Sequence, residues 1–122
     1  MNFFEQQMRS MFSDKEIITE DAQYVGKTML SRLDDDLLVK VQFVSTHVAK
    51  QYDAIRVRII NRTEGEVDTE TMLFADIIGL KDGNVKPYMW ECDNKGRWYT
   101  PVSNSEIEAI TRAVIDYIAM YL

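Results

Sequence analysis

Two segments in the middle of this chain alternate apolar and polar residues with a period of two. They are VKVQF at residues 39–43 and IRVRI at residues 55–59. Successive side chains of a β-strand point to opposite faces, so this period predicts two strands, each with one buried and one wetter face. A chain organised around such strands is expected to need apolar elements that cover the buried face of the sheet.

Turn-forming residues divide the rest of the middle of the chain into further strands. Aspartate, asparagine and glycine favour turns through side-chain hydrogen bonds or backbone freedom. The predicted turns are DDD (34–36), NRTEGE (61–66), KDGN (81–84) and DNKG (93–96), and the predicted strands are residues 23–33, 37–47, 52–60, 67–80, 85–92 and 97–101. Residues 67–80 are almost entirely apolar in their second half, which predicts a bulge or cover on both faces there.

An amphipathic helix is predicted at each end of the chain. The first places Phe4, Met8, Met11 and Phe12 on one face. The second begins at SNSE (103–106), a capping box in which a serine and a glutamate satisfy each other's backbone donors. The prediction is an α+β fold, in which an antiparallel meander of about six strands is flanked by an N-terminal and a C-terminal helix. We expect one domain over residues 1–122.

The charge balance limits the partners that this chain can bind without specificity. Its 122 residues include 20 acidic and 14 basic side chains, which give a net charge of −6 and a pI of about 4.7. This field disfavours binding to nucleic acid and to an anionic membrane, and no window approaches the about 18 apolar residues of a membrane span. Because Cys92 is the only cysteine, it forms no internal disulfide, and we expect a cytoplasmic protein.

Sequence motifs for the common catalytic chemistries are absent. The chain contains no glycine-rich phosphate-binding loop and no nucleophile elbow. A dyad of His47 and Cys92 would need the two side chains within about 3–4 Å, and Cys92 is expected in mid-strand, where cysteine acts as a small apolar side chain. The aspartates of DDD lack the alternating ligands of a calcium loop. We therefore expect no catalytic residue, no cofactor and no metal site.

A row of carboxylates on one predicted strand suggests a cation site at first. Glu66, Asp68 and Glu70 are spaced two residues apart, so they would share one face. Turns centred near residues 49 and 64 would place Arg58 opposite Glu70 and beside Lys40. Charges of opposite sign interleaved in this way predict cross-strand pairs on a solvated face rather than a metal site.

The segment MWECDNKGRWYTP, residues 89–101, contains both tryptophans and the only cysteine. A DNKG turn with Gly96 in the left-handed conformation would set Cys92 opposite Trp98. That register predicts a core face and a wetter face for the hairpin. The core face would hold Tyr88, Trp90, Cys92 and Trp98, and the wetter face Glu91, Arg97 and Tyr99.

Two surfaces are candidates for contact with a protein partner, which includes a second copy of the chain. One is the wetter side of the hairpin, and the other is the C-terminal helix, whose apolar arc is wider than one sheet needs. The candidate contact residues are Glu91, Arg97, Tyr99, Ile115 and Met120. The alternative is a small-ligand site or active site between the sheet and that helix. Its candidate walls are His47, Trp90, Trp98, Tyr117 and Tyr121.

Two segments carry a resemblance to known proteins: DAQYVGKTMLSRLDDDLLVKVQFVST (21–46) and YDAIRVRIINRTEGEVDTETMLFADIIG (52–79). Together with the later pair of tryptophans, they resemble a group of small proteins of unknown activity encoded by gut Firmicutes. The genes of that group are often carried on conjugative or other mobile elements. The resemblance implies a cytoplasmic accessory protein and carries over no functional residues. Together with the missing catalytic motifs, it leads us to expect a non-catalytic binding or regulatory protein that acts on a protein partner.

Overall fold

The computed structural model describes residues 2–92 and 95–122. Along the chain its elements are α1 (Phe3–Phe12), β1 (Gln23–Val25), β2 (Thr28–Arg32), β3 (Leu37–Val44), β4 (Gln51–Tyr52), β5 (Ala54–Asn61), β6 (Gly65–Leu73), α2 (Phe74–Ile78), a 3₁₀ turn (Asp82–Asn84), β7 (Met89–Cys92), β8 (Lys95–Trp98) and α3 (Asn104–Ala119). The predicted α+β fold, with a helix at each end of the chain, is confirmed.

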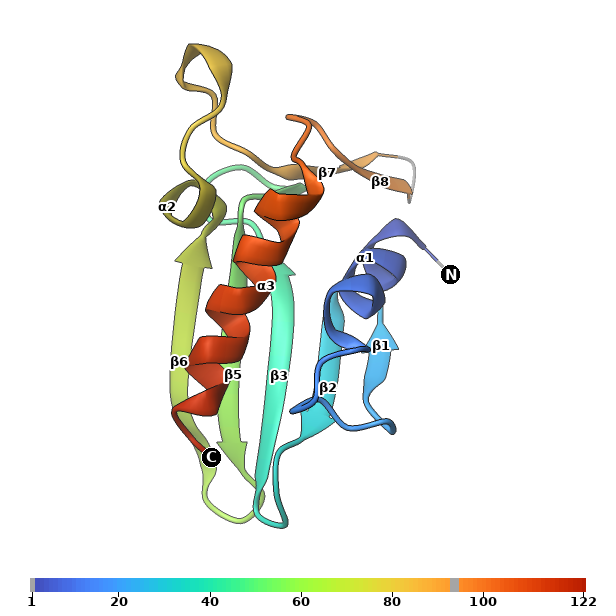
Figure 1. The fold of residues 1–122 in the computed structure, drawn as a ribbon, viewed down its shortest axis with the longest axis vertical. Coiled ribbons are helices and arrows are strands. Elements are labelled where there is room, and N and C mark those ends of the chain that lie inside the picture. Colours follow the sequence, from blue (N-terminus) through green and yellow to red (C-terminus); the bar gives the residue numbers. More distant parts are fainter. Residues whose placement is uncertain (1, 93–94) are drawn as a thin grey trace.

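The strands form two sheets instead of the single meander of about six strands that the sequence predicted. Five strands pair antiparallel in the order β1-β2-β3-β5-β6, and the remaining three form a small sheet in the order β4-β7-β8. Figure 1 shows α1 and α3 side by side on one face of the larger sheet, while β7 and β8 run across its upper end. The chain changes sheets at Asp53, between β4 and β5, so β4 contributes only two residues.

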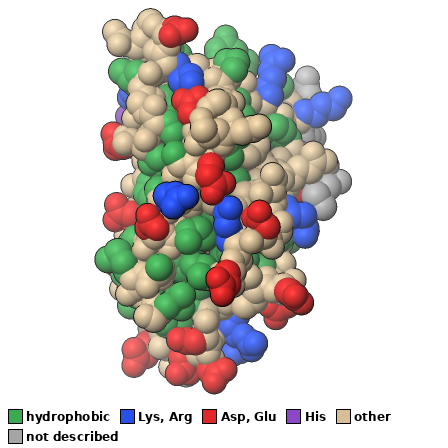
Figure 2. Space-filling model, in the orientation of Figure 1, with side chains coloured by type: hydrophobic (Ala, Val, Ile, Leu, Met, Phe, Trp, Pro, Cys, Tyr) green, Lys and Arg blue, Asp and Glu red, His purple; other side chains and the backbone are tan. Residues whose placement is uncertain are grey.

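The core lies between the larger sheet and the two helices. The period of two predicted in β3 and β5 is confirmed, because every second side chain of these strands is buried on the helix side. The completely buried side chains include Met8, Phe12, Val39, Val41, Ile55, Val57, Ile59, Ile110, Val114 and Ile118. Burial of each larger side chain contributes roughly 1.5–3 kcal/mol. On the solvent side of the helices, Figure 2 shows charged side chains among apolar ones, with acidic groups gathered at the lower end.

The predicted capping box of the C-terminal helix is confirmed, and the N-terminal helix is capped as well. The Asn2 side chain accepts a hydrogen bond from Glu5 N at 2.9 Å and caps α1. In α3, Ser103 and Glu106 form the complete capping box, with both reciprocal hydrogen bonds. Such caps satisfy amide donors that have no partner inside the helix. Within the described residues, no helix is long and apolar enough to cross a membrane.

Two segments differ from the predicted strands. Residues 23–33 form a tight hairpin, because Gly26 has a φ of 60° at the first position of the two-residue turn between β1 and β2. The apolar half of residues 67–80 forms the short helix α2. Its Phe74 is completely buried and donates its backbone N–H to Asp53 O at 2.9 Å, and Gly79, with a φ of 81°, ends the helix.

Candidate functional site

The small sheet has an inner face that is anchored on the body of the protein. Met89 is completely buried, and the Trp98 ring lies 5.2 Å from the Phe74 ring, centroid to centroid. Gly96, two residues before Trp98 in β8, lies under α1, where a Cβ atom would come within 2.6 Å of ring atoms of both Phe3 and Phe4. Since no side chain fits at Gly96, the glycine allows the first turn of α1 to pack directly on β8.

The predicted register of the β7–β8 hairpin is wrong. Met89 pairs with Trp98, and Trp90 pairs with Arg97. Gly96 lies inside β8 and is not in the left-handed conformation, so it does not end the turn. The rest of the predicted turn, residues 93–94, lies outside the described residues. The two tryptophans, predicted to share a core face, therefore lie on opposite faces, because directly paired residues of an antiparallel hairpin share a face.

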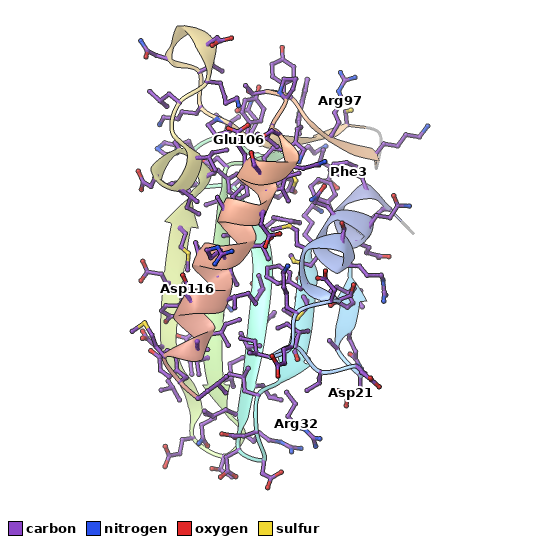
Figure 3. The ribbon with its side chains drawn as sticks, viewed as in Figure 1. Phe3, Asp21, Arg32, Arg97, Glu106 and Asp116 are labelled. Atoms are coloured by element: carbon purple, nitrogen blue, oxygen red, sulfur yellow. The ribbon has the colours of Figure 1, made fainter. Side chains whose placement is uncertain are left out.

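The outer face of the hairpin is an aromatic surface. The Tyr88 and Tyr99 rings stack at 5.2 Å with an interplanar angle of 16°, and the Trp90 ring meets Tyr99 edge-on at 5.5 Å. Tyr99 is 52% exposed, and Arg97 is exposed beside Trp90. In Figure 3, Arg97 points away from α1 and from the body of the protein. We call the surface formed by Tyr88, Trp90, Arg97 and Tyr99 the aromatic face.

Two open hollows border the aromatic face and share Val85, which is 43% exposed. One, of about 260 Å³, is lined by Tyr88 together with His47 and Val48, among others. The other, of about 510 Å³, is lined by Tyr99 and by residues that include Pro101. A stack of aromatic rings bordered by two hollows is a surface that can pack against the side chains of another protein.

The structure places Glu91 on the inner side of the small sheet, away from the aromatic face. Glu91 Oε1 lies 3.1 Å from Lys27 Nζ, and Glu91 Oε2 accepts a 2.7 Å hydrogen bond from the Tyr52 hydroxyl. The Lys27 ammonium also lies 5.1 Å from the ring centroids of Phe4 and Tyr52. This group joins the β1–β2 turn, α1 and the small sheet, so Glu91 acts as a structural clasp.

These contacts shift the pKa values of both acids in the clasp. The hydrogen bond from Tyr52 is the main cause that lowers the pKa of Glu91, and the Lys27 ammonium lowers it further against the opposing effect of burial. Burial, reinforced by the hydrogen bond to Glu91, raises the pKa of Tyr52 to about 12. At neutral pH the clasp therefore holds an ionised Glu91 and a neutral Tyr52.

The other two predicted contact residues lie on α3. Ile115 is half-buried and lines a hollow of about 250 Å³ with Lys15 and Arg112 among its neighbours. Met120, at the C-cap of α3, is 76% exposed. The structure thus brings Arg97 and Tyr99 together and leaves Ile115 and Met120 on a separate element.

The five residues proposed as walls of a ligand pocket do not share a cavity. The interface between the sheet and α3 is filled by completely buried side chains, Ile110, Val114 and Ile118 among them. Trp90 and Trp98 lie on opposite faces of the hairpin. At the C-terminal end of α3, the Tyr117 and Tyr121 rings lie 5.6 Å apart, and the Tyr121 hydroxyl donates to Asp68 of β6. That contact is the main cause that lowers the pKa of Asp68, and it fastens α3 to the sheet.

His47, the remaining predicted wall residue, belongs to a hydrogen-bonded group in the loop between β3 and β4. Asp53 accepts hydrogen bonds from the backbone N–H and the hydroxyl of Thr46, at 2.8 and 2.6 Å. His47 Nδ1 lies 3.2 Å from the same carboxylate and 2.7 Å from the Thr46 hydroxyl. Burial acts to raise the pKa of Asp53, but the hydrogen bonds from Thr46 and His47 together outweigh it and lower the pKa.

The geometry of the Thr46–His47–Asp53 group does not match a catalytic relay that activates a nucleophile. In such a relay the imidazole lies between the hydroxyl and the carboxylate and uses one ring nitrogen for each. Here the Thr46 hydroxyl already donates to Asp53, and both groups meet the same nitrogen of His47. The hydrogen bonds of this group therefore order the loop between β3 and β4. In the described part of the chain, no group of three histidine, cysteine, aspartate or glutamate side chains is arranged to hold a metal ion.

Comparisons with protein-family models, with curated proteins and with solved structures found no match for this chain. The resemblance to proteins of gut Firmicutes stays a prediction.

Proposed function

We propose that this protein is a non-catalytic, cytoplasmic binding protein that acts on a protein partner through its aromatic face. The observation that carries the proposal is the stack of Tyr88 on Tyr99, with Trp90 against its edge, on the outer side of the small sheet. The presence of a single thiol, Cys92, supports the cytoplasmic setting.

Tyrosine, tryptophan and arginine are the residue types that carry most of the binding energy at protein interfaces. Their rings bury a large area at a small cost in side-chain entropy. On the aromatic face the rings already contact one another, so little ordering is left for the moment of binding. The inner side of the same hairpin is held by Trp98 and Met89, which gives the outer side a rigid support.

The α3 residues Ile115 and Met120 support a partner surface less well. Ile115 is half-buried, and the exposed apolar side chains near the end of the chain are Met120 and Leu122. Scattered exposed apolar side chains of this kind are common on monomeric proteins. Met120 therefore provides the control for the aromatic face.

The test is affinity capture from the cells that produce the protein, with three versions of the full chain. These are the wild type, the double variant Arg97→Ala/Tyr99→Ala, and the control Met120→Ala. We expect the same protein to co-purify with the wild type and the control, and its recovery to fall at least tenfold with the double variant while the melting temperature stays unchanged. Equal recovery from all three versions would refute a role for the aromatic face.

Sedimentation of the purified versions distinguishes a second copy of the chain from a different partner. A dimer that forms with the wild type and Met120→Ala but not with Arg97→Ala/Tyr99→Ala would identify the partner as a second copy. If the wild type stays monomeric at all concentrations, the partner is a different protein. A dimer that the double variant leaves intact would show that this contact uses another surface.

A further inference from the structure

The larger sheet has a second face on which none of the described helices packs. Figure 1 views the molecule from the side that α1 and α3 cover. The strand register assigns Leu30, Lys40 and Arg58 to one cross-strand row of the opposite face, and Gln42 and Arg56 to the next. All five side chains are half-buried, because the neighbouring strands shield them while none of the described helices lies on top of them.

A β-bulge in β6 changes the charge of this face. The register shifts between Ile59 and Ile60, so that Ile60 pairs with Glu66 while Ile59 pairs with Asp68. Asp68 consequently points to the α3 side, where it accepts from Tyr121. The predicted carboxylate row is therefore split between the two faces, and the predicted position of Arg58 opposite Glu70 is wrong, because Thr69 occupies that position.

What remains on the open side is a concentration of positive charge. Lys40 pairs directly with Arg58, and Arg56 follows two residues along the same strand. Arg32 and Arg62, together with Asp21 among others, line a hollow of about 200 Å³ at the border of this face. We call the surface formed by Arg32, Lys40, Arg56, Arg58 and Arg62 the basic sheet face. These cations gather on one side of a chain whose net charge is −6.

Each arginine of this face has an acceptor or an acidic neighbour, but within the described residues none donates a hydrogen bond to a carboxylate. Arg58 Nε lies 3.7 Å from Glu66 Oε1, which is beyond hydrogen-bond distance. Arg58 Nε and the hydroxyl of its neighbour Thr69 are shielded from solvent and have no hydrogen-bond partner. Arg56 Nε donates to the Thr71 hydroxyl at 3.0 Å. These arginines and Lys40 are thus not neutralised by hydrogen-bonded carboxylates of the described residues, and their charged groups can attract a carboxylate of a partner.

Apolar side chains lie among the cations. Leu30 is next to Lys40 in one row, and Leu38 pairs with Ile60 in another. Each of these three apolar side chains is half-buried. A partner suited to this surface must therefore carry carboxylates and apolar groups together.

We propose that the basic sheet face binds an acidic amphipathic helix of a protein partner. Arg56 and Arg58 are about 7 Å apart along β5, and carboxylates at positions i and i+4 of a helix are separated by about 6 Å along its axis. A helix packed on a sheet is also the arrangement that already covers the other face. The apolar side chains of the partner helix would lie on Leu30, Leu38 and Ile60.

A nucleic acid suits this surface less well than an acidic helix. Phosphate chains provide no apolar groups for the leucine and isoleucine side chains, and binders of single strands place aromatic rings among their cations, which the basic sheet face lacks among its described residues. Acidic side chains elsewhere on the molecule, such as those at the lower end in Figure 2, also repel a long polyanion.

The test uses a synthetic 20-residue helical peptide with glutamates on one face and leucines beside them, together with an analogue in which glutamine replaces every glutamate. Binding to the full-length protein is measured by titration calorimetry at low and at high salt. We expect the acidic peptide to bind, to bind at least tenfold more weakly at high salt, and to bind at least tenfold more tightly than the glutamine analogue.

Charge reversal locates the site. Lys40→Glu/Arg58→Glu is expected to weaken binding of the acidic peptide at least tenfold, whereas Lys95→Glu/Arg112→Glu, which makes the same change in net charge elsewhere, should leave it within twofold. Circular dichroism melting checks that both variants fold. Absence of peptide binding, equal loss in both variants, or tighter binding of a 20-nucleotide single strand than of the peptide would each overturn the proposal. The Arg97→Ala/Tyr99→Ala variant should bind the peptide normally, so this test is separate from that of the aromatic face.

Discussion

The Lys27 ammonium lies 3.1 Å from Glu91 Oε1, and this ion pair joins the turn of the first hairpin to the second sheet. Both side chains are mostly shielded from solvent, with relative exposures of 28% and 23%. The contact is completed by the Tyr52 hydroxyl, which donates to the other carboxylate oxygen. The orientation of the aromatic face therefore depends on a polar clasp on the opposite side of the same sheet.

Removing the charge of the clasp should destabilise the protein. Glu91→Gln is expected to lower the free energy of unfolding by about 1–3 kcal/mol at pH 7, because the hydrogen bonds to a charged group are lost. The pKa of Glu91 is lowered from 4.5 in the folded protein, so its stabilisation is present above that value and is lost as the pH falls through the lowered value. Urea unfolding of both proteins at pH 7 and pH 3 measures this, and a difference that persists undiminished at pH 3 would contradict it.

The raised pKa of Tyr52 predicts that the free energy of unfolding falls at alkaline pH. Its pKa is raised from 10.0 to about 12, so the folded protein favours the neutral phenol. The stabilisation is complete below pH 10 and decreases as the pH rises from about 10 towards about 12. Unfolding free energies measured across this range should fall less steeply for Tyr52→Phe than for the wild type. Tyr99→Phe, which removes an exposed hydroxyl, is the control; equal slopes for all three proteins would disprove the prediction.

Gly96 is predicted to tolerate no side chain. A methyl group at this position would meet the Phe3 and Phe4 rings at 2.6 Å, and overpacking of this kind costs about 1–3 kcal/mol. Chemical denaturation should show this loss for Gly96→Ala, whereas the exposed neighbour variant Lys95→Ala should stay within about 0.5 kcal/mol of the wild type. A Gly96→Ala protein as stable as the wild type would show that α1 moves aside without cost.

The two tryptophans should differ sharply in their contribution to stability. Trp98 packs on the completely buried Phe74, so Trp98→Ala is expected to lower stability by about 3 kcal/mol. Trp90 lies on the outer side of the hairpin, and Trp90→Ala should cost about 1 kcal/mol. Thermal melting of the two variants compares them directly. Equal losses would indicate that both rings share one face, as the register predicted from sequence had implied.

Much of the fold could be predicted from local patterns. The alternation in β3 and β5, the amphipathic arc of α1 and the capping box of α3 all act within a few residues, so the sequence shows them directly. The prediction failed where a short segment had two acceptable local structures. Residues 74–78 were predicted as strand because apolar runs of this length suit either a strand or a buried helix, and the contact between Phe74 and Asp53 favours the helix.

The candidate site was only partly predictable. Arg97 and Tyr99 were expected on the wetter side of the hairpin and lie on the aromatic face, but Tyr88 and Trp90 were assigned to the core. The alternation in YMWEC already groups Tyr88 and Trp90 on one side of a strand. Which side faces the body depends on the pairing with β8, and the turn sequence alone suggested the wrong pairing.

The sequence by itself determined which side chains share a face within each strand and helix, because backbone geometry sets the periods of 2 and 3.6. Only the tertiary structure decided which of those faces became core and which became surface. Gly96 became part of β8 because α1, at the other end of the chain, packs its first turn there. The bulge in β6 turned Asp68 towards α3 and left Lys40 and Arg58 on an open face. Both outcomes depend on contacts between residues far apart in sequence, which no local pattern contains.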